Sequence, residues 1–143
     1  MRKLAKILIA AALALGPASA SFGAGGIFQP GNNISVKSFI VAGNTNPVII
    51  QPNGNASLYN IEAFNNSTTL AYVKVYNAAN ATCGSGTPQA RYMIPASASA
   101  TLMFNPNGDA YVFGITVCVT GGIADNDTTA PAASEYVVNV HFQ

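Results

Sequence analysis

The sequence contains no tryptophan, one histidine and two cysteines, and only 8% of its residues are charged. Nucleic acid binding depends on clustered Lys and Arg side chains, which this composition does not supply. Most acid–base mechanisms need a base beside the reacting group, and the one imidazole, His141, alternates with Asn139 and Gln143 near the chain end. A solvated histidine on a strand is the simpler interpretation. We therefore expect no direct nucleic acid partner, no enzymatic activity and no cofactor.

The chain also lacks an apolar run of the ~20 residues that a membrane-spanning helix requires. Near its start, residues 7–15 form an uncharged apolar run of nine residues. Three of the six basic residues precede this run, and a triplet of small residues follows it. This order predicts a secretory signal peptide over residues 1–20, with cleavage after Ala20 or after Ala24. After cleavage no transmembrane anchor would remain.

Without the leader, three basic residues oppose five acidic ones, which leaves a net charge of −2. These eight residues are Lys37, Lys74, Arg91, Glu62, Asp109, Asp125, Asp127 and Glu135. So few charges suit a domain that packs against protein neighbours or against itself, because a weakly charged free monomer tends to associate. About 120 residues suffice for one domain with a core. We expect a single domain over residues 27–143.

The two cysteines, Cys83 and Cys118, lie 35 residues apart in the exported part of the chain. In an oxidising compartment we expect them to form a disulfide. Closing a loop of this length stabilises a fold by about 3 to 4 kcal/mol in the chain-entropy model. Neither cysteine belongs to a CxxC pair and His141 is distant in sequence, which disfavours a metal site.

After Gly26 the apolar residues recur with period two and not with the helical period. Over residues 111–120 the odd-numbered positions are apolar, which predicts a strand whose odd-numbered side chains face the core. Cys118 would then point away from the core, so the disulfide would hold the loop 80–88 over the outer face or the end of this strand. Seven further strands are predicted at 34–41, 47–51, 57–65, 70–77, 89–94, 100–104 and 135–142.

The strands at 57–65 and 70–77 can be paired by the parity of their apolar positions. Placing Ala63 opposite Ala71 also sets Ile61 against Val73 on the core face. This predicts a hairpin with its turn at residues 65–69. About eight short strands and no helix together predict an all-β fold, a two-sheet antiparallel β-sandwich, with a jelly roll as one arrangement of the strands.

Two polar segments are candidate sites. Asp125, Asn126 and Asp127 could offer several oxygens to Ca²⁺, although the loop lacks the later glutamate of an EF-hand. Asp and Asn side chains also cap their own turns, which we favour over the metal site.

The second segment is the outward stripe of Tyr72, Lys74 and Tyr76, which carries amphipathic aromatic rings of the kind enriched at binding surfaces. It is a candidate contact surface, and the alternative is a strand face that a neighbouring loop covers.

Several segments of the C-terminal half together resemble a known group of proteins. They are Gly-Ile at 114–115, Gly-Gly-Ile-Ala-Asp-Asn-Asp-Thr-Thr-Ala at 121–130, the closing strand at 137–140, Val-Lys-Val-Tyr at 73–76, Gly-Thr-Pro at 86–88 and Ile-Pro at 94–95. This pattern resembles small β-sandwich proteins encoded by tailed bacteriophages and prophages. The resemblance implies a virion structural role, as a head decoration or a tail-associated component, and it implies no catalytic residues. The signal peptide and the cysteine pair are two features in which this chain departs from such relatives.

Two functions follow as expectations. In the first, the chain is a non-enzymatic structural or interaction protein, phage-derived and virion-associated, with protein partners such as a capsid or tail assembly, or with copies of itself. In the second, it is an exported periplasmic or surface binding module, in which Tyr72, Tyr76 and the Asp125 loop contact glycan or a cell surface. The expected location is the periplasm or the cell exterior, or the virion if a phage encodes the chain.

Overall fold

The computed structural model describes residues 34–132 and 135–143, and within these residues it has nine β-strands and no helix. The strands are β1 (Ser35–Ala42), β2 (Val48–Gln51), β3 (Ala56–Asn65), β4 (Ala71–Asn77), β5 (Ala90–Ile94), β6 (Ala98–Met103), β7 (Asp109–Tyr111), β8 (Ile115–Thr120) and β9 (Glu135–Phe142). Seven of the predicted strands begin and end within two residues of an observed one. The predicted signal peptide and the first residues of the predicted domain lie outside the described residues. In the part described, no helix has the length and hydropathy needed to cross a membrane.

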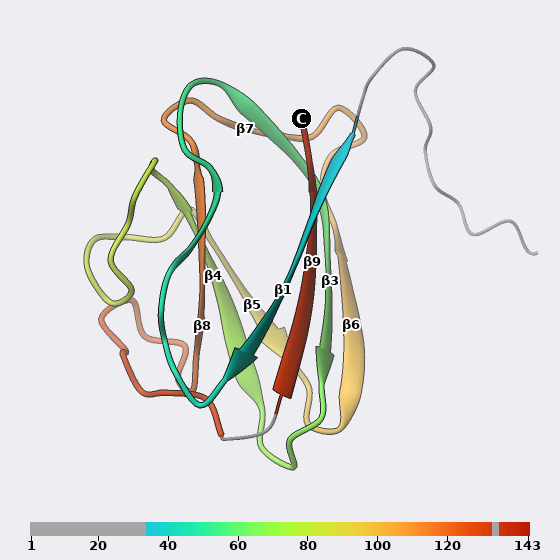
Figure 1. Cartoon of the computed structure of the whole chain (residues 1–143), viewed down its shortest axis with the longest axis vertical. Coiled ribbons are helices and arrows are strands. Elements are labelled where there is room, and N and C mark those ends of the chain that lie inside the picture. The colour runs from blue at the N-terminus through green and yellow to red at the C-terminus, as the bar shows by residue number, and fades with distance from the viewer. Residues whose placement is uncertain (1–33, 133–134) are drawn as a thin grey trace, which may run out of the picture.

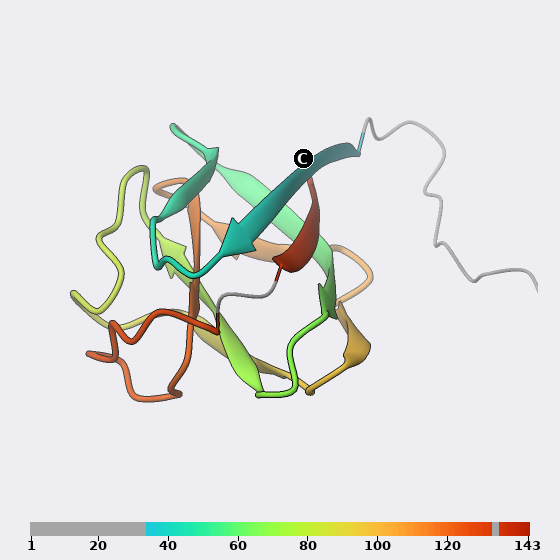
Figure 2. The same ribbon diagram turned by 60° about the horizontal axis from the view of Figure 1, so that its bottom comes forward.

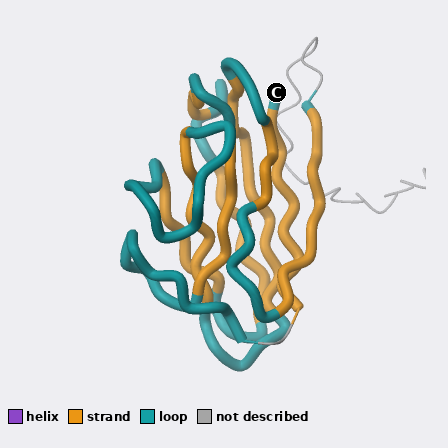
Figure 3. Tube along the Cα trace, turned by 60° about the vertical axis from the view of Figure 1, so that its left-hand side comes forward, coloured by secondary structure: helices purple, strands orange, loops and turns teal. Residues whose placement is uncertain are grey.

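The strands form two antiparallel sheets that pack as a sandwich (Figures 1 and 3). Sheet A has the strand order β1-β9-β3-β6, and β7 pairs with the first residues of β3. Sheet B has the order β2-β8-β4-β5. The predicted all-β, two-sheet antiparallel sandwich is confirmed.

The connectivity is that of a jelly roll. β4 pairs with β5, β3 with β6, β2 with β8 and β1 with β9, so the four antiparallel pairs are nested in the chain. The described polypeptide is therefore one long hairpin whose tip is the loop at residues 78–89. Because successive pairs belong alternately to sheet B and sheet A, the hairpin is rolled around its own core.

The core lies between the sheets and follows the alternation expected for strands with one buried face. On β8 the side chains of Ile115, Val117 and Val119 belong to this core, as the odd-numbered pattern predicted. Tyr111 and Tyr136 are fully buried in it. Each such side chain contributes about 1.5 to 3 kcal/mol of apolar burial, which makes the alternation the main determinant of the layered arrangement.

The predicted strand at 111–120 is wrong as a single element. β7 belongs to sheet A and β8 belongs to sheet B, so the chain leaves one sheet and enters the other at residues 112–114. Gly114 has φ of 109°, and a Cβ atom there would lie 2.5 Å from the carbonyl oxygen of Gln51. Only glycine adopts this backbone conformation without strain, so Gly114 permits the crossing. Phe113, predicted in the core, is instead 68% exposed.

The predicted hairpin of residues 57–65 with 70–77 is also wrong, because β3 and β4 belong to different sheets. Ile61 and Val73 both lie in the core, but they face each other's sheet across the sandwich instead of lying side by side in one sheet. The buried amide of Asn65 stabilises the connection by which the chain passes from β3 in sheet A to β4 in sheet B. Its Nδ2 donates to the carbonyl oxygens of Thr69 (2.8 Å) and Pro95 (2.9 Å).

A register shift in β3 between Leu58 and Asn60 changes which side chains face the core. Ala56 and Leu58 are buried before the shift, and Ile61 and Ala63 are buried after it. A β-bulge of this kind moves the core face from even-numbered to odd-numbered positions. Tyr59, predicted to share the core with Ile61, therefore lies outside it.

Candidate functional site

The two sheets each have an outer face, and the two faces differ in what covers them. We call the outer face of sheet B the covered face. It is built by Tyr72, Lys74 and Tyr76 of β4 and by Thr116, Cys118 and Thr120 of β8, which are paired across the two strands. Two loops, at residues 78–89 and 121–132, lie beside these strands on the same side of the molecule (Figures 1 and 2).

A disulfide attaches the first of these loops to the covered face. Cys83 and Cys118 are bonded, with their Cα atoms 5.8 Å apart, and Cys118 lies outside the sandwich core in a small cluster with Tyr76. The hydroxyl of Thr116 donates to the carbonyl oxygen of Ala78 at 2.8 Å. The predicted disulfide is confirmed, and so is the prediction that it holds the loop over the outer face of this strand.

A buried lysine holds the second loop. Lys74 is fully buried, and its Nζ donates to the carbonyl oxygens of Ala124 (2.6 Å) and Asp127 (3.1 Å). Desolvation lowers the pKa of Lys74, while the nearby carboxylates of Asp127 and Asp125 oppose this shift. The ammonium group thus acts as an internal clamp between β4 and the loop.

The acidic side chains of this loop form hydrogen bonds and an ion pair with other residues of the chain. Asp127 Oδ1 accepts hydrogen bonds from the backbone N–H groups of Gly122 and Thr129, each at 3.1 Å. Asp125 forms an ion pair with Arg91. Asp127 therefore caps its own turn, which is the interpretation that the sequence favoured over Ca²⁺ binding. In residues 34–132 and 135–143, no group of three or more His, Cys, Asp or Glu side chains is placed to hold a metal ion.

The loops leave little of the predicted contact stripe accessible. Lys74 is 0% exposed and Tyr76 is 3% exposed, while Tyr72 is half-buried. The stripe points outward, as predicted, but the loops cover it, so Lys74 and Tyr76 are not available to a partner. The sequence had left this alternative open. The burial follows from contacts between segments far apart in the chain, such as Lys74 with Ala124.

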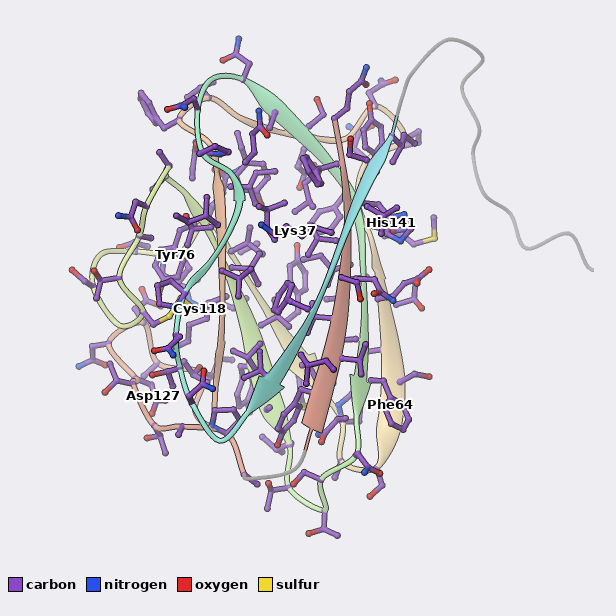
Figure 4. All side chains as sticks on the ribbon, viewed as in Figure 1. Lys37, Phe64, Tyr76, Cys118, Asp127 and His141 are labelled. Atoms are coloured by element: carbon purple, nitrogen blue, oxygen red, sulfur yellow. A yellow bond between two sulfur atoms is a disulfide. The ribbon has the colours of Figure 1, made fainter. Side chains whose placement is uncertain are left out.

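We call the outer face of sheet A the open face, because no loop within residues 34–132 and 135–143 covers it. Its outward side chains fall into three rows across β1, β9, β3 and β6, set by the strand register. The first row is Ile40, Val137, Phe64 and Ser99; the second is Ser38, Asn139, Glu62 and Thr101; the third is Val36, His141, Asn60 and Met103. Figure 4 shows Phe64 and His141 on the side of the molecule opposite Tyr76, Cys118 and Asp127.

Large apolar side chains are exposed at both ends of the open face. Ile40 is 62% exposed and Phe64 46% in the first row, and Val36 is 57% and Met103 63% in the third. Single exposed apolar residues are ordinary on protein surfaces. Here four of them lie on one sheet face, in two clusters on either side of a polar middle. The sequence contained a signal for this surface. Val36, Ile40 and Phe64 are apolar although they alternate with residues such as Phe39, Val41 and Ala63, which already supply the core.

The middle of the open face is polar and slightly hollow. A depression of about 250 Å³ is lined by Glu62, Ala63, Phe64, Ser99, Ala100, Thr101, Val137 and Asn139. His141 Nε2 lies 3.7 Å from Glu62 Oε2. Within the described residues, His141 Nε2 and Asn60 Oδ1 are buried polar atoms without a hydrogen-bond partner, and they lie next to each other in the third row.

Comparisons with known proteins give no family for this chain. No protein-family model matches it, and no curated protein matches it. Among solved structures, the crystal structure of PirA is similar with a TM-score of 0.44 and 11% identity, over 76% of this chain and 93% of that one. The coat protein of Tobacco streak virus is similar with a TM-score of 0.35 and 8% identity, over 78% of this chain and 88% of that one. Neither similarity is close enough to transfer a function.

Proposed function

We propose that this protein is a non-enzymatic structural protein that acts by contact, as a virion-associated component of phage type such as a head decoration or a tail component. The observation that carries this proposal is the open face, where Ile40, Phe64, Val36 and Met103 are exposed on three strands of one sheet, β1, β3 and β6. Aromatic residues and methionine are enriched at protein interfaces, and Phe64 and Met103 supply one of each at the two ends of this face.

The absence of enzymatic activity is part of the proposal and is supported by the surroundings of the histidine. Across the neighbouring strands, His141 lies opposite Val36 and Asn60. Neither side chain carries a hydroxyl or thiol group that the imidazole could activate. The carboxylate of Glu62 lies 3.7 Å from Nε2 of His141 and forms an ion pair with it when the imidazole is protonated.

The proposed setting is an exported or particle-bound one, with protein partners or further copies of the chain. The Cys83–Cys118 disulfide supports an oxidising environment. The low content of charged residues, 8% of the chain, supports a protein that functions in contact with other protein molecules.

Particle incorporation tests the proposal. Particles of the element that encodes this chain are purified and analysed by mass spectrometry, and we expect the chain to be present at a fixed ratio to the coat protein. A Phe64→Asp variant should be lost from the particles, because a carboxylate on the open face would have to be desolvated at the contact. Phe113→Asp is the matched control, since Phe113 is exposed to a similar or greater degree outside this face. Particles without the wild-type chain would disprove the proposal.

The hollow on the open face favours a second candidate function, an exported glycan-binding module. An aromatic ring (Phe64), a carboxylate (Glu62), an amide (Asn139) and a hydroxyl (Thr101) line it together. Such a combination can bind a sugar through its apolar face and its hydroxyl groups. In this candidate the contact residues are those of the open face and not Tyr72 and Tyr76. A glycan array tests it, with Asn139→Ala expected to abolish any signal and Asn107→Ala, in an exposed turn, expected to retain it.

A further inference from the structure

We propose that the open face binds the same face of a second copy of this chain, with a two-fold axis that runs along the strands between β9 and β3. This inference rests on the proposed contact function and names its partner. In such a dimer the two sheets pack face to face with their strands aligned, which is the ordinary geometry of sheet-on-sheet packing. Each contact then occurs twice, as in any isologous interface.

The three rows of the open face are complementary to themselves under this axis. The axis keeps each row opposite itself and reverses the strand order, so β9 of one copy lies over β3 of the other and β1 lies over β6. In the first row Val137 meets Phe64 of the second copy, and in the third row Val36 meets Met103 of the second copy. Each end of the face thus contributes an apolar pair, while Ile40 in the first row lies opposite Ser99 of the second copy.

The polar groups match as well. In the middle row the amide of Asn139 meets the carboxylate of Glu62 of the second copy, while the two Glu62 side chains stay apart. In the third row His141 lies opposite Asn60 of the second copy. A two-fold axis across the strands would instead place Glu62 against itself, where two carboxylates repel each other.

The β1 edge of sheet A is a poorer site for a second copy. β1 is one of the edge strands of this sheet, and Lys37 on it extends across to β2, where its Nζ donates to the carbonyl oxygen of Ile49 at 2.6 Å. A lysine on an edge strand opposes pairing with another chain. This disfavours self-association through the β1 edge.

The size of the face sets the expected affinity. Four strands spaced about 4.8 Å apart and about six residues long cover roughly 20 Å by 20 Å. Interfaces that bury less than about 1,200 Å² in total are characteristic of weak or transient complexes. We therefore expect a dimer that forms at micromolar concentrations, which many copies on a particle surface would reach locally.

Sedimentation velocity of the exported, disulfide-bonded chain from low micromolar to near-millimolar concentration tests the dimer. We expect a shift from monomer to dimer in the wild type, and at least a tenfold weaker association for Phe64→Glu and for Met103→Glu, whose side chains lie at opposite ends of the face. Phe113→Glu is the matched control and should associate like the wild type. Circular dichroism confirms that each variant is folded. A wild type that stays monomeric throughout, or variants that associate as the wild type does, would overturn the inference.

Cross-linking tests the position of the axis. Facing sheets lie about 10 Å apart, so a short bismaleimide reagent is suited to joining cysteines across the interface. A mixture of Val36→Cys and Met103→Cys should give the mixed cross-linked dimer in greater yield than either variant alone gives its own dimer, because β1 and β6 lie three strand spacings apart in one sheet. A dimer that forms in solution but gives no mixed cross-link would overturn the proposed axis.

Particle analysis separates this inference from the function on which it rests. A wild type that is monomeric in solution but present in particles refutes the dimer and leaves the contact function standing. A chain that forms the dimer in solution but is absent from particles refutes the virion-associated function and leaves the dimer standing.

Discussion

The outer face of sheet B is covered by the chain's own loops, whereas no part of the chain that the structure describes covers the outer face of sheet A. On the covered face, a disulfide, a buried lysine and the capped turn at Asp127 attach the loops at 78–89 and 121–132 to β4 and β8. On the open face, Val36, Ile40, Phe64 and Met103 stay exposed. The difference indicates a division of labour: changes to the covered face should lower the stability of the fold, and changes to the open face should lower association.

Removal of the disulfide should have the largest effect on stability. Replacing Cys83 and Cys118 together by serine releases a 35-residue loop, and the free energy of unfolding should fall by about 3 to 4 kcal/mol. Urea denaturation followed by circular dichroism measures this. The variant should still form the dimer where it remains folded, because the cysteines lie on the face that is not involved. A loss of association without a loss of stability would contradict the comparison.

A substitution at the connection between β7 and β8, where the chain passes from sheet A to sheet B, should have the next largest effect on stability. Gly114→Ala places a side chain at φ of 109° and against the carbonyl oxygen of Gln51, which should cost about 2 to 3 kcal/mol. Gly54→Ala is the matched control: Gly54 also has a positive φ, 77°, but has open space around its Cα. It should cost about 1 kcal/mol, the backbone strain alone. Equal effects in thermal or urea unfolding would refute the close contact at Gly114.

Loss of the hydrogen bonds from Lys74 should have the third largest effect on stability. Lys74→Met keeps an apolar stem but leaves the carbonyl oxygens of Ala124 and Asp127 without their donor. We expect a loss of about 2 kcal/mol in urea unfolding, the usual cost of removing a charged donor from buried acceptors. Lys37→Met is the control, because Lys37 is exposed and should contribute much less. Faster proteolysis within residues 121–132 should accompany the loss at Lys74.

The pH dependence of the free energy of unfolding should show a smaller effect of the same lysine. Because burial lowers the pKa of Lys74 in the folded chain, the unfolded chain binds more protons as the pH approaches the ordinary value of 10.5. The free energy of unfolding contributed by this group therefore rises with pH in that window. Tyr92 and Tyr111 act in the opposite direction above pH 10, since burial raises their pKa values. The difference between wild type and Lys74→Met isolates the lysine, and a difference that does not change with pH would refute its lowered pKa.

Substitution on the open face should change stability least. Phe64→Ser should alter the free energy of unfolding by no more than about 0.5 kcal/mol, because the ring is already partly in solvent in a single copy. The same variant should lose association in sedimentation velocity. If instead it unfolds at clearly lower urea concentration while its association is retained, the division of labour between the two faces is wrong.

Much of the fold could be predicted from local patterns. Alternation of apolar and polar residues identified the strands at 57–65 and 70–77 and placed Ile61 and Val73 in the core, because side chains alternate along any strand. The same alternation could not decide which strands are neighbours. Two strands with apolar faces satisfy it equally well side by side in one sheet or facing each other across a sandwich, and the buried side chain of Asn65 selects the second arrangement.

The candidate sites divide in the same way. The role of Asp127 as a turn cap could be predicted because it depends on neighbours two to five residues away. The burial of Lys74 and Tyr76 could not, since it depends on loops that return to β4 from residues 83 and 124. The sequence therefore left open whether the stripe on β4 is a contact surface or a covered face, and the loops decide that Lys74 and Tyr76 are covered.

By itself, the sequence determined that this chain is all-β, where its strands lie, which side chains on most strands face inward, and that its two cysteines are bonded, because these follow from alternation and from having only one possible pair. Only the tertiary structure decided the jelly-roll connectivity, the break at Gly114 and the identity of the open face. These depend on which distant segments pack together, and many strand orders bury the same apolar side chains equally well.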